Sequence, residues 1–160
     1  MSFNHFDEHG QAVMVDVSSK PQTLRVAIAS ARVSMSKSTL VDILDRKTTK
    51  GDVFAVARLA GITGAKKTSE LIPLSHPLSI HAISIEFETD LDDGAIRIRS
   101  TVKAFERTGV EMEAMVAASV TALTIYDMCK GIDKGIIIGE TLLLYKEGGK
   151  SGIYQREALK

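Results

Sequence analysis

A histidine enclosed by two prolines is the first feature of the sequence that could do chemistry. In the stretch LIPLSHPL, residues 71–78, His76 lies between Pro73 and Pro77. Proline fixes its own backbone and biases the preceding residue toward an extended conformation, so we expect a rigid, non-helical segment. Such a backbone could aim an imidazole at a ligand, although a proline turn that ends a helix beside an incidental histidine is the simpler interpretation. His81 follows five residues after His76, but no third metal ligand is near in the sequence, so we reject a metal motif.

A second candidate is an acidic and a basic residue at the end of an apolar stretch. Asp127 and Lys130 are three residues apart in YDMCK, so on a helix they share one face. The dipole at a helix C-terminus disfavours a carboxylate, and apolar neighbours disfavour it further. We therefore expect a carboxyl group suited to proton transfer, and a partly exposed ion pair is an equally supported alternative.

Two glutamates stand at the other end of the same stretch. Thr108 and Glu111 match a capping box, which leaves Glu113 without a structural reason beyond a favourable helix dipole. On one helix, Glu113 and Asp127 would lie about 21 Å apart along the axis, with azimuths that differ by about 40°. One small substrate cannot contact both in one chain. We hypothesise that two copies with antiparallel helices bring Glu113 of one chain toward Asp127 of the other.

Basic residues that could bind an anion are scattered along the chain. Lys50 and Gly51 precede a predicted helix whose N–H groups could bind phosphate, but Asp52 competes for that position. Taken singly, four further lysines are expected to be solvated surface residues: Lys66, Lys67, Lys146 and Lys150. The segment EGGKSG, 147–152, is similar to the end of a P-loop but lacks the first glycine and the following helix.

The composition excludes several classes of protein. The 160 residues are 44% apolar, and 20 basic residues balance 20 acidic ones, so no general basic field attracts nucleic acid or an anionic membrane. Only 5% are aromatic, few for base stacking. Cys129 is the single cysteine and can form neither an internal disulfide nor a zinc site alone. No signal peptide or membrane-spanning length is expected, which predicts a cytoplasmic protein.

The hydrophobic pattern predicts the elements that must position these groups. Alternation predicts four strands, at 23–35, 79–90, 95–106 and 135–147. Helices are predicted at 36–47, 50–72 and 111–131. Expected N-caps are Ser36 or Ser38 for the first helix and Asp52 for the second. Small residues along one side of the second helix predict close approach of another helix: Ala57, Gly61, Gly64 and Ala65.

This order of elements predicts an α+β fold. Helices would cover one face of a mostly antiparallel sheet, similar to a split βαβ arrangement. We expect a single domain over residues 1–160, with an N-terminal arm at 1–20, a catalytic core at 21–152 and a tail at 153–160. The arm could contain a short strand at 12–17.

Three long blocks, 50–78, 108–130 and 148–152, together closely resemble the MoaC family, the cyclic pyranopterin monophosphate synthases of molybdenum cofactor biosynthesis. The resemblance implies a ferredoxin-like fold and a homohexamer built as a trimer of dimers. It implies a lyase that converts 3′,8-cyclo-7,8-dihydroguanosine 5′-triphosphate to cyclic pyranopterin monophosphate with release of pyrophosphate. It implies no cofactor and no metal in the protein, although Mg²⁺ could accompany the triphosphate. An upstream radical enzyme could hand over the substrate.

The resemblance also places the site residues. It implies that Asp127 is the active-site acid or base and that Lys50 and Lys130 are catalytic lysines. The family's substrate-binding segments fall on five residues of this chain: Leu74, Ser75, His76, Met112 and Glu113. Many relatives carry cysteine where this chain has Ser75, which argues against an essential thiol there.

A non-catalytic interpretation stands beside this one. An oligomeric module could bind a nucleotide or phosphorylated metabolite as a regulator, because the fold alone does not determine function. The pairing of Asp127 with Lys130 favours the enzyme over the regulator. A pocket that only binds anions would gain nothing from a carboxylate.

Overall fold

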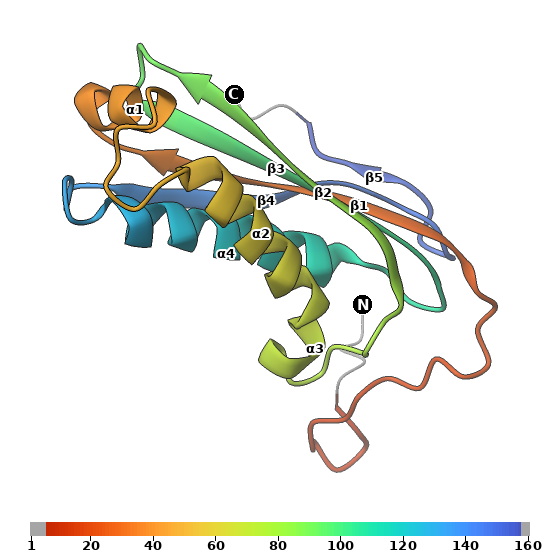
Figure 1. Ribbon diagram of the computed structural model, residues 1–160. Helices are drawn as coiled ribbons and strands as arrows, with labels where there is room; N and C mark the ends of the chain where they lie inside the picture. The colour runs from red at the N-terminus through yellow and green to blue at the C-terminus, as the bar shows by residue number, and fades with distance from the viewer. Residues whose placement is uncertain (1–5, 158–160) are drawn as a thin grey trace.

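A five-stranded antiparallel sheet, covered on one face by helices, forms the framework of the computed structural model, which describes residues 6–157 (Figure 1). The strands are β1 (Thr23–Ser34), β2 (Ile80–Asp90), β3 (Ala95–Glu106), β4 (Ile137–Glu147) and β5 (Tyr154–Gln155). The helices are α1 (Lys37–Leu44), α2 (Val53–Lys66), α3 (Thr68–Leu71) and α4 (Glu111–Cys129). The strand order β2-β3-β1-β4-β5 puts β3 between β1 and β2. The predicted α+β fold with a split βαβ arrangement is confirmed.

Alternation along β1 and β3 builds the core. Ala27, Ala29, Ala31 and Val33 of β1 are fully buried, as are the isoleucines at 96 and 98 of β3. The small alanines let α4 lie close to the sheet, where it packs on β1, β3 and β4, while α2 lies beside it over β2. Burial of these side chains supplies the main stabilising free energy of the fold.

The close approach of α2 and α4 is also confirmed. A methyl group at Gly61 would overlap Thr121 Oγ1, and one at Gly64 would lie 2.9 Å from Val120 Cγ2. Two glycines therefore let α4 and α2 come nearer than alanines would allow. This contact fixes α4, whose two ends carry the candidate site residues.

Two of the predicted N-terminal caps are confirmed, and the third, the capping box of α4, is wrong. Ser36 accepts a hydrogen bond from the Thr39 N–H at 3.3 Å, and Asp52 accepts one from the Ala55 N–H at 3.0 Å. The capping box at Thr108 does not form, because the N-cap of α4 is Val110 and carries no side-chain cap bond. Glu111 is therefore the first residue of α4, too early for the capping role.

Three further details differ from the prediction. The predicted helix at 50–72 is interrupted at Lys67, and there the Thr68 hydroxyl donates to the Ala65 carbonyl at 2.9 Å. The strand β5 has two residues, too few to show alternation. The strand expected at 12–17 is wrong: within the described residues only Ala12 forms a bridge, with Phe6. This part of the chain extends beyond α3, away from any strand with which it could pair (Figure 1).

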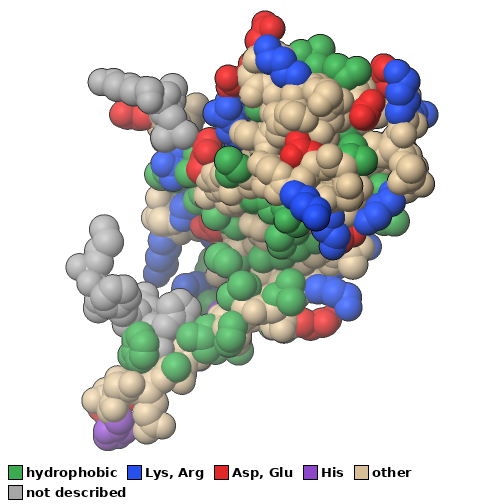
Figure 2. Space-filling view, turned by 90° about the vertical axis from the view of Figure 1, so that its left-hand side faces the viewer, with side chains coloured by type: hydrophobic (Ala, Val, Ile, Leu, Met, Phe, Trp, Pro, Cys, Tyr) green, Lys and Arg blue, Asp and Glu red, His purple; other side chains and the backbone are tan. Residues whose placement is uncertain are grey.

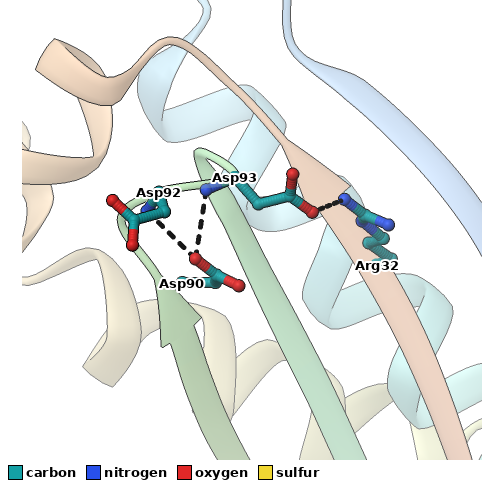
Figure 3. A network of polar contacts seen from close by, with 4 residues as sticks. All are labelled: Arg32, Asp90, Asp92 and Asp93. Carbon is teal, nitrogen blue, oxygen red and sulfur yellow. Dashed lines mark hydrogen bonds and ion pairs between the residues drawn. The ribbon is translucent and has the colours of Figure 1, made fainter.

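The turn between β2 and β3 is held by side chains (Figure 3). Asp90 accepts hydrogen bonds from the N–H groups of Asp92 and Asp93, both at 3.0 Å. Asp93 in turn forms an ion pair with Arg32 of β1 at 2.6 Å. Arg32 alternates with the buried Ala31 and so points away from the helices.

Helix α4 is long and apolar enough to cross a membrane by length and composition, contrary to the expectation that no segment reaches that length. Its place in the fold explains this character. It contacts α2 on one side and three strands of the sheet on another, and half of its apolar window is buried. A core helix surrounded in this way is apolar over most of its circumference.

Candidate active site

Three of the predicted site residues meet at the C-terminal end of α4. Lys130 is the C-cap of α4, and its Nζ lies 2.7 Å from Oδ1 of Asp127. Lys50, on the loop between α1 and α2, donates to the Asp127 carbonyl at 2.8 Å and lies 3.6 Å from Oδ2. Basic and acidic side chains are intermixed over this end of the molecule (Figure 2). We call these three residues the aspartate–lysine cluster.

Of the two alternatives for Asp127, the structure has the partly exposed ion pair, and the expected apolar surroundings are wrong. Its side chain is 60% exposed instead of packed among apolar groups. The hydrogen bond and charge of Lys130, and then the charge of Lys50, lower the pKa of the Asp127 carboxyl. Asp127 conversely raises the pKa of Lys130. Two nearby ammonium groups thus outweigh the helix dipole, and at neutral pH the cluster holds one carboxylate between two cations.

The five predicted substrate-binding residues meet at the other end of α4. They line one cavity of about 490 Å³, which we call the histidine cavity: Leu74, Ser75, His76, Met112 and Glu113. The segment between α3 and β2 that carries His76 is neither helix nor strand, as its prolines predict. His76 Nε2 lies 2.8 Å from the Val15 carbonyl, so Nε2 donates and Nδ1 remains for a ligand. The N-terminal arm thereby fixes the imidazole.

Glu113, in the wall of the histidine cavity, has a raised pKa. Its side chain is almost fully buried, at 3% exposure. Burial, assisted by the charge of Glu111, raises the pKa of Glu113 to about 7. A carboxyl group that titrates near neutral pH in the wall of a cavity can either donate or accept a proton.

Ionisation of Glu113 should destabilise the fold as the pH rises. The folded protein retains a proton that the unfolded chain releases near the ordinary pKa of 4.5. The stabilisation is complete below pH 4.5 and is lost as the pH approaches 7, by about 3 kcal/mol in total. In urea unfolding at constant protein concentration, Glu113→Gln should therefore lose less stability than the wild type between pH 5 and 8. Glu70→Gln, at an exposed glutamate, serves as the control; equal pH slopes for Glu113→Gln and wild type would contradict the shift.

A basic cavity was not predicted from the sequence. It has a volume of about 570 Å³ and is lined by five cationic side chains: Lys20, Arg25, Arg107, Lys146 and Lys150. It shares Lys20, Thr108, Gly109 and Glu111 with the histidine cavity, so the two are adjacent. Glu111 lies 3.3 Å from Lys146, in place of the expected capping bond. The cations come from separate segments of the chain, and only folding brings them together.

The other predicted anion sites are weaker. Asp52 caps the N-terminus of α2, as anticipated, and Lys50 turns to Asp127 instead of standing over that helix end. The P-loop-like segment lies between β4 and β5 with no helix after it. Within residues 6–157, no three His, Cys, Asp or Glu side chains cluster as metal ligands.

The two groups of site residues lie at opposite ends of one helix. Glu113 and Asp127 are about 21 Å apart along the axis of α4, a distance that no small substrate bridges. One chain thus contains a basic cavity, a histidine cavity with a near-neutral acid, and a separate aspartate–lysine cluster.

Comparison with known proteins identifies the relatives of this chain. The MoaC family matches residues 14–149. Cyclic pyranopterin monophosphate synthase of Geotalea uraniireducens (strain Rf4) is 69% identical over 157 residues, 98% of each chain. The enzyme of the same name from Geobacter sulfurreducens (strain ATCC 51573 / DSM 12127 / PCA) is 67% identical over 98% of each chain. That of Geobacillus sp. (strain WCH70) is 51% identical over 98% of this chain and 92% of its own. The chain belongs to the MoaC family.

Proposed function

We propose that this protein is a cyclic pyranopterin monophosphate synthase, a phosphorus–oxygen lyase. It converts 3′,8-cyclo-7,8-dihydroguanosine 5′-triphosphate to cyclic pyranopterin monophosphate and releases pyrophosphate. One observation supports this most: the residues expected to bind substrate line a cavity adjacent to a second cavity with five cationic side chains. A heterocycle with a triphosphate tail requires this pairing of a ring pocket with a polyanion pocket.

The basic cavity suits the phosphate end of the substrate. Closing a cyclic phosphate expels pyrophosphate, and the negative charge that develops on this leaving group is stabilised by fixed cations. Arg25 and Arg107 offer planar, forked donors to phosphate oxygens, and the three lysines add charge. Mg²⁺ could accompany the triphosphate, and these cations would then share its charge.

The ring rearrangement requires several proton transfers. In our proposal Asp127, held ionised by Lys130 and Lys50, accepts a proton, and the two ammonium groups donate one or stabilise charge. Glu113, which has a pKa of about 7 and lines the same cavity as His76, can either donate or accept a proton.

We further propose that the complete site is shared between two chains of a homo-oligomer. Apolar side chains on α2 and α4 are more than half exposed in the single chain, among them Leu59 at 66% and Leu123 at 58%. A surface of this kind is typical of a protein interface. An isologous two-fold contact with antiparallel α4 helices would bring the histidine cavity of one chain to the aspartate–lysine cluster of the other. We propose a hexamer built as a trimer of such dimers.

We expect the enzyme to act in the cytoplasm as a single-domain chain, and to receive its substrate through transient contact with an upstream radical enzyme. Nucleic acid and membranes are not among the proposed partners, given the balanced charge of the sequence.

Incubation with the cyclised dihydro-GTP intermediate tests the function directly. The protein should release pyrophosphate and form a product with a pterin chromophore, both absent with heat-treated protein. Tight binding of the intermediate without either product would instead favour a non-catalytic, ligand-binding regulator.

A further inference from the structure

We propose that Gly149 is a positioning residue: because it has no side chain, it leaves the Arg25 guanidinium room in the wall of the basic cavity, where this group binds phosphate. The inference rests on the proposed function, since it takes the basic cavity as the place where phosphate groups bind. It assigns a role to the segment EGGKSG that is unrelated to a P-loop.

Arg25 is a buried cation whose side-chain hydrogen bonds, within the described residues, go to neutral carbonyl groups. Its residue is 8% exposed, and it donates from Nε to the Glu106 carbonyl and from Nη2 to the Arg107 carbonyl, both at 3.1 Å. Within residues 6–157, no carboxylate lies at ion-pair distance from Arg25. Two neutral acceptors fix the guanidinium but leave its charge uncompensated. Burial of such a charge is costly, and an anion in the adjoining cavity would offset the cost.

The loop after β4 packs its backbone directly against this group. Gly148 and Gly149 have φ angles of +101° and +75°, a conformation that favours glycine. A methyl group at Gly149 would overlap Arg25 Nη1 and lie 2.8 Å from Cζ. Nη1 is the nitrogen for which no hydrogen bond forms within the described residues. Gly149 therefore determines where Nη1 of the guanidinium can lie.

The two glycines meet different obstacles. A methyl group at Gly148 would overlap the Leu24 carbonyl, which is backbone and cannot move without disturbing β1. At Gly149 the obstacle is the end of a flexible side chain. Gly149→Ala should therefore displace the Arg25 guanidinium from its two carbonyl acceptors while the strands stay in place. A displaced guanidinium loses the alignment that makes a forked contact with phosphate strong.

The chain offers a matched control for backbone strain. Gly152, in the same loop, has a φ of +65°, and a methyl group there would meet nothing within 4 Å. Gly152→Ala thus imposes the same unfavourable backbone conformation without touching Arg25. Arg25→Gln is the second reference variant, since glutamine keeps a donor near the Glu106 carbonyl but lacks the atoms that a methyl at position 149 would overlap.

Binding of inorganic pyrophosphate, measured by titration calorimetry, tests the inference. Gly149→Ala should weaken binding about tenfold or more, and Gly152→Ala should change it less than about twofold. Arg25→Gln should weaken binding by a similar factor. Adding Gly149→Ala to Arg25→Gln should then weaken it no further, because the two substitutions remove the same contact.

Several outcomes would overturn the inference. Equal affinities of Gly149→Ala and Gly152→Ala would show that the lost contact is not specific to Arg25. Additive losses in the double variant, or wild-type affinity of Arg25→Gln, would do the same. Failure of the wild type to bind pyrophosphate would instead overturn the assignment of the basic cavity, and product formation from the cyclised intermediate would show whether the proposed function survives.

Discussion

Asp127→Asn should lower product formation about 10²–10⁴-fold and leave the folded protein intact. Asparagine has nearly the shape of aspartate but cannot accept a proton. The Asp127 side chain is 60% exposed and contacts the two lysines of its cluster, so no core packing is lost. Exposed ion pairs contribute little to stability. The expected result is therefore a loss of turnover with an unchanged urea midpoint, measured on the cyclised dihydro-GTP intermediate.

Asp93→Asn is the matched control. Asp93 is 64% exposed and pairs with Arg32 at 2.6 Å, close to the exposure of Asp127 and to its 2.7 Å contact with Lys130 (Figure 3). It lies in the turn between β2 and β3, beside a side chain that points away from the helices. Its substitution should leave turnover unchanged. Near-normal turnover by Asp127→Asn would remove Asp127 from the proposed chemistry.

Most of the fold could be predicted because local patterns repeat. The alternation in β1, β2, β3 and β4 needs no long-range information. At the interruption at Lys67 the Thr68 hydroxyl bonds to the Ala65 carbonyl, and β5 pairs with the edge of β4. Such features arise from tertiary contacts that no single stretch of sequence contains.

The chemistry of the two acids was harder to predict than their position. The dipole of α4 disfavours a charge at Asp127 and favours one at Glu113, yet the structure has the opposite pKa shifts. Lys50, which is distant in the sequence, folds back onto Asp127, and Glu113 points into the protein. Neighbouring charges and burial each shift a pKa by more than a helix end does, and both are set by tertiary structure.

The two cavities were likewise only partly predictable from the sequence. Resemblance to a family indicated Leu74, Ser75, His76, Met112 and Glu113, and all five do line one cavity. Lys146 and Lys150 were expected to be ordinary surface lysines, because single lysines carry no signal. Alternation puts Arg25 on the same face of β1 as the buried Ala27 and Ala29, but it does not show that this cation borders a cavity. Only the return of β4 beside β1 brings these cations together.

A shared site predicts recovery of activity when two inactive variants are combined. Asp127→Asn and Glu113→Gln, each of low activity alone, should regain about a quarter of wild-type turnover when co-expressed in equal amounts. Random pairing makes half of the dimers mixed, and in each mixed dimer one of the two sites receives both intact residues. Tagging the two variants differently lets the mixed dimers be purified, in which half of the wild-type turnover is expected.

A second pair of variants distinguishes sharing from mere stabilisation by a partner. Asp127→Asn and Lys130→Ala alter the same cluster, so in every mixed dimer each site contains one defective cluster and no activity should return. His76→Ala alters the histidine cavity, so combined with Asp127→Asn it should recover as Glu113→Gln does. Recovery by both kinds of pair would point to a general stabilising effect, and recovery by neither would place a complete site in one chain. The 21 Å between the two ends of α4 makes this pattern a geometric requirement of any mechanism that uses both acids.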